Sequence, residues 1–278
     1  MKILPASTLE IIIGQCICCE SLMFDPALQK MLSFEYGRVL YVTMALFTND
    51  ATACFNQMVP NISTLVAQKY GMDLKVMISR NLVMADMEHS VHIKHGNSCD
   101  TYREESGDVK IAGETQGTSS AGCLWSIKSH MFLRTHQTLH EGINLPHVNG
   151  TRNIRRNNDV FLDDADAKAA QQGATFSLSE RKLVAHLVKG AQLWAKLIGS
   201  MGCAITQHRS VWQMLSWWDN TYSLTLKEYS SLNITISDCQ GVKTTIMKRG
   251  SSVPKKGLGC LQAPTAQQTS KFNHRLQK

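Results

Sequence analysis

The sequence has no apolar stretch long enough to cross a membrane as a helix. No run approaches the roughly 18 uninterrupted apolar residues that such a helix requires. The first 24 residues superficially look like a signal peptide, but Glu10 interrupts them and no small-residue cleavage site stands out. We therefore expect a soluble, intracellular protein without membrane contact, placed either in the nucleus or in the cytoplasm.

Paired Cys-x-x-Cys motifs of the kind that hold zinc are also lacking. The nine cysteines are an odd number, and their spacing does not form two such motifs. This pattern is more typical of thiols in a reducing compartment than of a disulfide framework or a zinc centre. We interpret the one cluster, Cys16-Ile17-Cys18-Cys19, as small buried apolar residues.

Charged residues are few, at 18%, while hydrophobic residues make up 43% of the 278-residue chain. This composition belongs to globular rather than disordered chains, and the length allows one large domain or two small ones. The formal net charge is +7, with basic residues biased toward the second half. Such a balance permits a polyanionic partner such as nucleic acid, but it does not require one.

An apolar run that breaks into adjacent carboxylates is the most informative segment. Residues 160–162 have strand character, whereas Asp163 and Asp164 must lie at the edge of a sheet, in water or on a metal. Neighbouring carboxylates repel each other, so such a site raises a pKa, pairs with a base or holds a divalent cation. Residues 165–170 are expected to return as the partner strand of a hairpin.

A third acid follows another candidate strand. Residues 39–47 form a near-continuous apolar and β-branched run, which predicts a strand buried on both faces that ends at Asp50. Taken alone, Asp50 is equally well explained as a helix N-cap or a solvated turn. If this strand and the hairpin share one sheet, the three acids converge, and converging carboxylates suit Mg²⁺. Successive strand residues face opposite ways, so we expect Asp163, rather than Asp164, to be the stronger partner of Asp50.

Periodicity predicts a mixture of helices and strands, and hence an α+β fold. A polar, glycine-bearing loop at 113–120 runs into a helix and could approach a phosphate or base pair closely. Helices are expected at 63–69, 73–89, 121–141 and 177–199, with two short helices in 7–34 joined near Pro26. Strands are expected at 90–95, 101–105, 109–112, 211–218, 222–226, 232–237 and 242–247.

Five motifs resemble those of reverse transcriptases and occur in that family's order. Asp50-Ala-Thr-Ala-Cys-Phe55 is similar to the D-x4-[FY] motif, Gly113-x-x-Gln116-Gly117 to the template loop, and Phe161-Leu162-Asp163-Asp164 to the aromatic-x-D-D hairpin. The segment 202–212 resembles the region with a basic residue after the hairpin, and 256–260 resembles the primer grip. The likeness covers about residues 37–264 and is to retroelement reading frames of the non-LTR kind, such as those of microalgae.

The resemblance implies a right-hand polymerase palm, an α+β core of antiparallel sheet backed by helices. The palm would span 37–264, after partial fingers in 1–36 and before a disordered tail at 265–278, and the thumb would be missing. The activity implied is that of an RNA-directed DNA polymerase, with template-primer nucleic acid and dNTP as partners. Two Mg²⁺ ions, or Mn²⁺, would assist nucleotidyl transfer from the dNTP to a primer 3′-OH.

The resemblance also assigns residues to the catalytic step. Asp50, Asp163 and Asp164 would be the catalytic acids and the metal ligands. Phe55 would be the steric gate against a ribose 2′-OH. A bulky ring at that position argues against an RNA-dependent RNA polymerase, which otherwise shares the arrangement of acids.

Substrate contacts are assigned in the same way. Gln116 and Gly117 would contact the template and the nascent base pair, and Leu258 and Gly259 would form the primer grip. Arg209 would stand where the family has a lysine near the leaving pyrophosphate. Arginine keeps the charge but changes the geometry and the pKa, so general-acid chemistry is not expected of it.

Two alternatives stay open. Asn56 stands where the family commonly has a second acid, and Ala121-Gly122 stand where Ser-Pro is expected. These departures and the missing thumb favour a degenerate, non-catalytic retroelement remnant that keeps the fold and weak nucleic-acid binding, because affinity depends on phosphate contacts spread over a long surface. The other alternative is an unrelated α/β binding protein whose aspartate pair is a solvated turn.

Overall fold

The structure is a computed structural model that describes 14 segments of the chain. It combines helices with a mainly antiparallel sheet, so the expected α+β class is confirmed. None of the helices in these segments is long and apolar enough to span a membrane. The described residues are 24–39, 42–52, 57–94, 96–102, 119–146, 153–156, 158–161, 164–170, 180–220, 223–226, 233–238, 240–250, 255–257 and 260–262.

The chain divides into two compact units, Met1–Cys16 with Ala53–Lys128, and Ile17–Thr52 with Ser129–Lys278. The predicted domain boundaries at 36 and 264 stay predictions. Helix α7 passes from the first unit to the second. The first unit contains α5 (Pro60–Lys69), α6 (Leu74–Ala85), β2 (His89–Ile93), β3 (Gly96–Tyr102) and the beginning of α7 (Ser119–Leu139).

Local sequence signals explain the helices of the first unit. Pro60 opens α5, where its missing N–H costs nothing. Gly71 follows this helix with a φ of 91°, a conformation that glycine adopts without strain. Asp73 caps α6, because its carboxylate accepts a hydrogen bond from the Lys75 backbone N–H at 2.7 Å.

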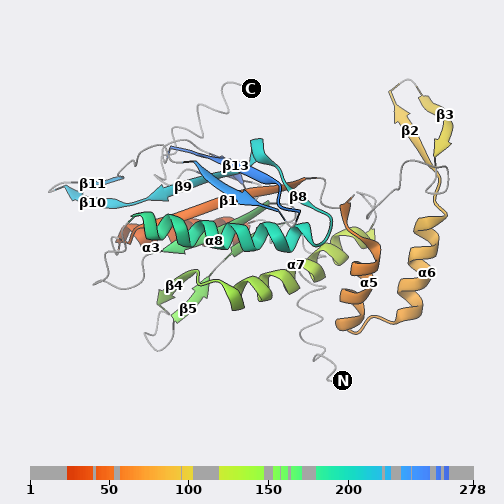
Figure 1. Ribbon diagram of the computed structural model, residues 1–278, viewed down its shortest axis with the longest axis horizontal. Helices are drawn as coiled ribbons and strands as arrows, with labels where there is room; N and C mark the ends of the chain where they lie inside the picture. The colour runs from red at the N-terminus through yellow and green to blue at the C-terminus, as the bar shows by residue number, and fades with distance from the viewer. Residues whose placement is uncertain are drawn as a thin grey trace. The chain divides into compact units, whose positions relative to one another are not determined.

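The second unit is built around a sheet in the order β12-β13-β9-β1-β7-β6, with β8 also pairing with β1. Figure 1 labels β13, β9, β1 and β8 of this sheet. All pairs are antiparallel except β13 with β9, so the expected antiparallel sheet is in fact mixed. The main elements are α3 (Phe24–Val39), β1 (Met44–Thr52), β6 (Asn158–Phe161), β7 (Asp164–Ala170), α8 (Glu180–Gly199), β8 (Ala204–Ile205), the 3₁₀ helix η2 (Gln207–Arg209), β9 (Val211–Leu215), β12 (Ile234–Ser237) and β13 (Lys243–Lys248). Six further strands form three antiparallel pairs, which are β4 (Ile143–Pro146) with β5 (Asn153–Arg156), β10 (Trp217–Asn220) with β11 (Ser223–Leu226), and β14 (Lys255–Gly257) with β15 (Cys260–Gln262).

Helix α8 covers one face of the sheet. Its Trp194 donates a hydrogen bond to the side chain of Asn49 in β1. The Asn49 side chain therefore lies on the face of the sheet that α8 covers. On β7 this face carries Ala165, Ala167 and Ala169, all buried, and such small side chains let a helix backbone approach closely. The alanine repeat of β7 is therefore a docking surface for α8.

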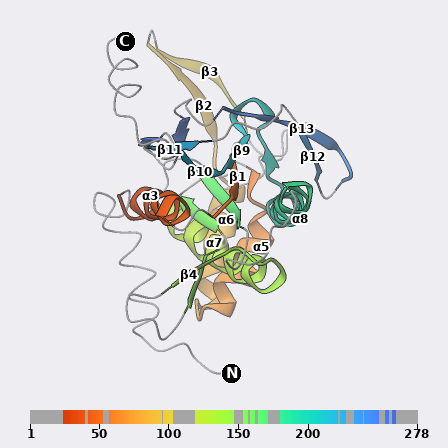
Figure 2. The same ribbon diagram turned by 90° about the vertical axis from the view of Figure 1, so that its left-hand side faces the viewer.

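Helix α3 covers the opposite face, as Figure 2 shows with α3 and α8 on either side of the strands. Side chains alternate between the faces of a strand, so Met44, Leu46 and Thr48 of β1 point toward α3. An apolar cluster fills one end of this interface. It consists of Phe34, Met44, Leu46, Ile143, Ala170 and Leu215.

Several expectations from the sequence are confirmed and others are wrong. The hairpin of β6 and β7 is confirmed. The prediction that two helices meet near Pro26 is wrong, because α3 begins at Phe24 and continues through Pro26. Proline is tolerated in the first turn of a helix. The first strand runs from Met44 to Thr52 and so continues past Asp50. The single strand expected at 211–218 is broken, because β9 ends before Ser216.

Candidate functional site

Asp50 and Asp164 occupy opposite positions of the same rung in the sheet. Strand β1 is central, and its antiparallel register with β7 sets Asp50 across from Asp164. Opposite positions of an antiparallel pair belong to one face and lie about 5 Å apart. The pairing of β1 with β7 thus places residues 50 and 164, which are 114 residues apart in the sequence, opposite each other.

Asp163 was expected to be the stronger partner of Asp50. It belongs to the two-residue connection between Phe161 and Asp164, and it lies outside the described residues. The register gives the position opposite Asp50 to Asp164 instead. The preference for Asp163 over Asp164 therefore stays a prediction.

Arg209 contacts Asp50 directly. Its Nη1 donates to Oδ2 of Asp50 at 3.0 Å, and the Asp50 side chain is only 11% exposed while that of Arg209 is 65% exposed. The backbone supports this contact, because the Thr206 N–H donates to the Asp50 carbonyl at 2.9 Å. The segment after α8 therefore folds along the end of β1 and carries Arg209 to the acid.

The chemistry of these groups suits a hard cation. Two acidic positions share a rung, and carboxylate oxygens are the ligands that Mg²⁺ and Mn²⁺ prefer. Within the described segments no group of three or more histidine, cysteine, aspartate or glutamate side chains is arranged to hold a metal. A cation bound through Oδ2 of Asp50 would have to compete with the Arg209 guanidinium for that oxygen.

The other residues assigned by the resemblance lie outside the described part of the chain. The structure therefore places Asp164 at the register position opposite Asp50 and Arg209 in contact with Asp50, and it leaves the remaining assignments as predictions. These remaining residues are Phe55, Gln116, Gly117, Asp163, Leu258 and Gly259.

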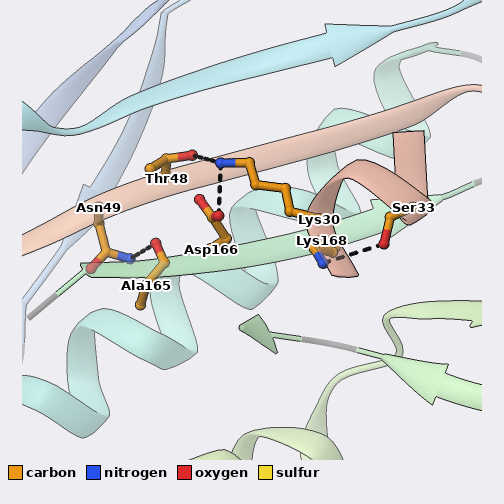
Figure 3. Close-up of polar contacts among 7 residues, drawn as sticks. All are labelled: Lys30, Ser33, Thr48, Asn49, Ala165, Asp166 and Lys168. Atoms are coloured by element: carbon orange, nitrogen blue, oxygen red, sulfur yellow. Dashed lines mark hydrogen bonds and ion pairs between the residues drawn. The ribbon is translucent and has the colours of Figure 1, made fainter. Parts of the chain in front are cut away.

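A buried polar cluster next to the acids was not expected from the sequence. Lys30 of α3 extends its ammonium group to Asp166 of β7 at 2.7 Å and to the Thr48 hydroxyl of β1 at 3.5 Å (Figure 3). The Lys30 side chain is 5% exposed and that of Asp166 is fully buried. Thr48 and Asp166 are opposite each other, one step along the ladder from Asp50 and Asp164.

A second lysine completes this cluster. Lys168, also fully buried, donates to the Ser33 hydroxyl of α3 at 3.4 Å. Burial by itself raises the pKa of Asp166, but the charge of Lys30, hydrogen bonds from Lys30 and Thr48, and the charge of Lys168 outweigh it. The pKa of the Asp166 carboxyl is consequently held below its usual value. Asp166 is therefore a carboxylate that charge partners keep ionised inside the protein.

One sequence signal could have revealed this cluster. The strand reads Asp164-Ala-Asp-Ala-Lys-Ala-Ala170, so charged residues alternate with alanine at the period of a strand. Such alternation ordinarily indicates one solvated face. Lys30 lies four residues before the buried Phe34 and therefore on the same side of α3. A lysine on the buried side of this helix is the sequence signal that the helix packs against a charged strand face.

Three histidines meet where α7 and α8 pack together. His136 contacts the Gly190 carbonyl through Nε2 at 3.0 Å, and the His140 ring stacks on His186 with centroids 4.4 Å apart. Burial lowers the pKa of His140 to about 3, aided by the nearby His136, His186 and Arg155, while a backbone hydrogen bond at Lys168 opposes the shift. His140 is therefore neutral at ordinary pH.

Comparisons with protein-family models and with curated protein sequences found no match.

Proposed function

We propose that this chain carries the palm of an RNA-directed DNA polymerase, which transfers a nucleotidyl group from a dNTP to a primer 3′-OH. The observation that carries the proposal is the register of β1 and β7, which sets Asp50 opposite Asp164. The resemblance to reverse transcriptases assigns both residues to catalysis. A central strand flanked by an acidic hairpin is also the arrangement that a palm requires.

The residues of this site have separate roles in the proposal. Asp50, Asp164 and the adjacent Asp163 would hold the divalent cations, which lower the barrier by neutralising charge on the attacking and leaving oxygens. Arg209 would stabilise negative charge on the departing pyrophosphate, because a guanidinium stays charged and binds phosphate well. Its contact with Asp50 would then exchange for a contact with the phosphates.

Primer extension tests this proposal. The purified protein is incubated with poly(rA)/oligo(dT), dTTP and Mg²⁺ or Mn²⁺, beside the variant Asp163→Ala/Asp164→Ala. Extension by the parent protein and its loss in the variant are expected. A comparison of dTTP with UTP examines the role assigned to Phe55, since a steric gate predicts strong preference for the deoxynucleotide.

A second function is binding of nucleic acid without catalysis, as in a degenerate remnant. The ion pair of Arg209 with Asp50 favours it, because a carboxylate held by a guanidinium is less available to a metal. Fluorescence anisotropy with a labelled RNA–DNA duplex separates the two functions. Binding that is unaltered by Asp163→Ala/Asp164→Ala, together with no extension in either metal, would support the remnant.

A further inference from the structure

Helix α3 meets the sheet through two kinds of contact. Toward one end of the interface, Phe34 packs among the apolar residues Met44 and Leu46. Toward the other end, nearest Asp50, the contacts are made by Lys30 with Asp166 and Thr48. The change from apolar to ionic contact therefore occurs beside the candidate site.

Apolar side chains would have covered this part of the sheet at lower cost. Removing two charges from water is expensive, and exchanging a buried ion pair for apolar residues of similar volume often leaves stability unchanged or raises it. Lys30 and Asp166 are both nearly inaccessible to solvent, so the full desolvation penalty applies to them. A role in specificity explains such a pair better than a role in stability.

The register of β7 is what this pair can specify. A slip by two residues keeps the same side chains toward α3, so the hydrophobic pattern alone does not prevent it. In one direction the slip would set Lys168 opposite Thr48, against the ammonium of Lys30. In the other direction Asp164 would take the position opposite Thr48, but Asp166 would lie opposite Leu46 and Lys168 opposite Met44, so two charged positions would enter the apolar cluster.

We propose that Lys30, through Asp166 and Thr48, is a positioning residue that fixes the register of β7 and thereby places Asp164 opposite Asp50. Figure 3 shows the ammonium of Lys30 between Thr48 of β1 and Asp166 of β7, so one group contacts both strands. One ladder step, about 7 Å, separates this contact from the acids. The inference rests on the proposed function, because it concerns how the acids are held for a cation.

The test measures Mn²⁺ affinity by electron paramagnetic resonance, with Mn²⁺ alone as the probe. The signal attributed to the site is the part that Asp50→Asn abolishes. The decisive variant is Lys30→Met/Asp166→Val, which replaces the ion pair by apolar residues. Arg38→Ala is the matched control, since Arg38 forms an exposed ion pair with Glu35 on the same helix, at 2.6 Å.

Lys30→Met/Asp166→Val is expected to unfold cooperatively in urea, at a midpoint lowered because buried Lys168 loses a nearby carboxylate, while its Mn²⁺ affinity falls at least tenfold. Arg38→Ala should change neither quantity. Unchanged Mn²⁺ affinity in the double variant would overturn the inference and leave the proposed function standing. If the parent protein shows no Asp50-dependent Mn²⁺ binding, the proposed function fails and the inference falls with it.

Thr48→Val provides a second measurement that does not depend on folding of the double variant. The substitution is isosteric and removes only the hydroxyl that Lys30 contacts on β1. We expect a severalfold loss of Mn²⁺ affinity in a protein that unfolds cooperatively, as followed by circular dichroism. Parent-like affinity in Thr48→Val would also overturn the inference.

Discussion

The guanidinium of Arg209 donates a hydrogen bond to Oδ2 of Asp50 at 3.0 Å and forms an ion pair with this carboxylate. The two partners differ in environment, because the Asp50 side chain is almost buried while that of Arg209 is largely exposed. Because Asp50 is almost buried, release of Arg209 leaves its carboxylate without a positive charge unless another cation takes that place. The contact is therefore compatible with exchange of Arg209 for a metal ion.

Arg209→Ala should raise the affinity for Mn²⁺ and lower the rate of nucleotide addition. The affinity rises because the cation no longer competes with the guanidinium, and the rate falls because the charge proposed to meet pyrophosphate is gone. Calorimetric titration with Mn²⁺ and single-nucleotide incorporation measure the two effects. Arg38→Ala serves as the control, and equal or weaker Mn²⁺ binding in Arg209→Ala would refute competition.

Gly190 should not tolerate alanine, although it lies within helix α8. A Cβ added there would approach Cε1 of His140 to 2.7 Å, so the packing of α7 on α8 must shift. We expect a loss of about 1–3 kcal/mol in the free energy of unfolding, measured with urea. His140→Ala should relieve the clash, so that the double variant is less destabilised than the sum of the two single changes.

Gly122→Ala is the matched control for this prediction. Gly122 also lies in a helix, but an added Cβ would have no neighbouring atom within 4 Å. Alanine should therefore stabilise the protein by up to about 1 kcal/mol, because it has the higher helix propensity. Destabilisation of both variants to the same extent would show that the His140 contact is not the cause.

Acidification should weaken the protein through His140. Its pKa is about 3 in the fold and 6.5 in the unfolded chain, so between these values the unfolded state binds the proton more readily. Stability is complete above pH 6.5 and decreases as the pH falls through this window. Because solvent screening reduces the effect, we expect a loss of about 1–2 kcal/mol at pH 5.

Urea unfolding at a series of pH values measures this dependence. His140→Gln removes the titrating ring, so its stability should change less between pH 7 and pH 5 than that of the parent protein. His136, whose pKa is also lowered by burial, is unchanged in this variant and accounts for part of the remaining slope. An identical slope in the variant and the parent would exclude His140 as a cause.

Trp194→Phe should destabilise the protein through Asn49. The indole N–H donates to Oδ1 of Asn49 at 3.2 Å, and Asn49 donates to the Ala165 carbonyl of β7, also at 3.2 Å. Phenylalanine keeps the aromatic packing but leaves a buried amide oxygen without this donor. The expected cost is about 1–3 kcal/mol in urea unfolding. No change in stability would mean that water replaces the indole.

The sequence predicted those helices and strands that are indicated by neighbouring residues in the chain. The hairpin of β6 and β7 follows from an apolar run that breaks into acids, and the end of α8 follows from Gly199. The register that opposes Asp164 to Asp50 is a long-range property and could not be read from either strand. The ion-pair partner of Asp166 could not be predicted either, because Lys30 belongs to a helix and precedes residue 166 by 136 positions.

Boundaries were less predictable than elements. Strand β1 was expected to begin at residue 39, but α3 continues to Val39 and the strand begins at Met44. A short apolar run such as 39–47 suits a helix or a strand equally well, so its pattern does not distinguish the last turn of a helix from the start of a buried strand. The boundary between helix and strand depends on tertiary contacts, such as those of Phe34 with Met44 and Leu46 of β1.

Single-turnover addition of one dTTP to an oligo(dT) primer on poly(rA) tests the central claim most directly. The comparison is between the parent protein, Asp50→Asn and the control Arg38→Ala, each in Mg²⁺ and in Mn²⁺. Polymerase chemistry at the rung of Asp50 and Asp164 predicts addition by the parent and by Arg38→Ala, and a loss of at least about 10³-fold in Asp50→Asn. Addition that survives Asp50→Asn, or no addition by the parent in either metal, would contradict it.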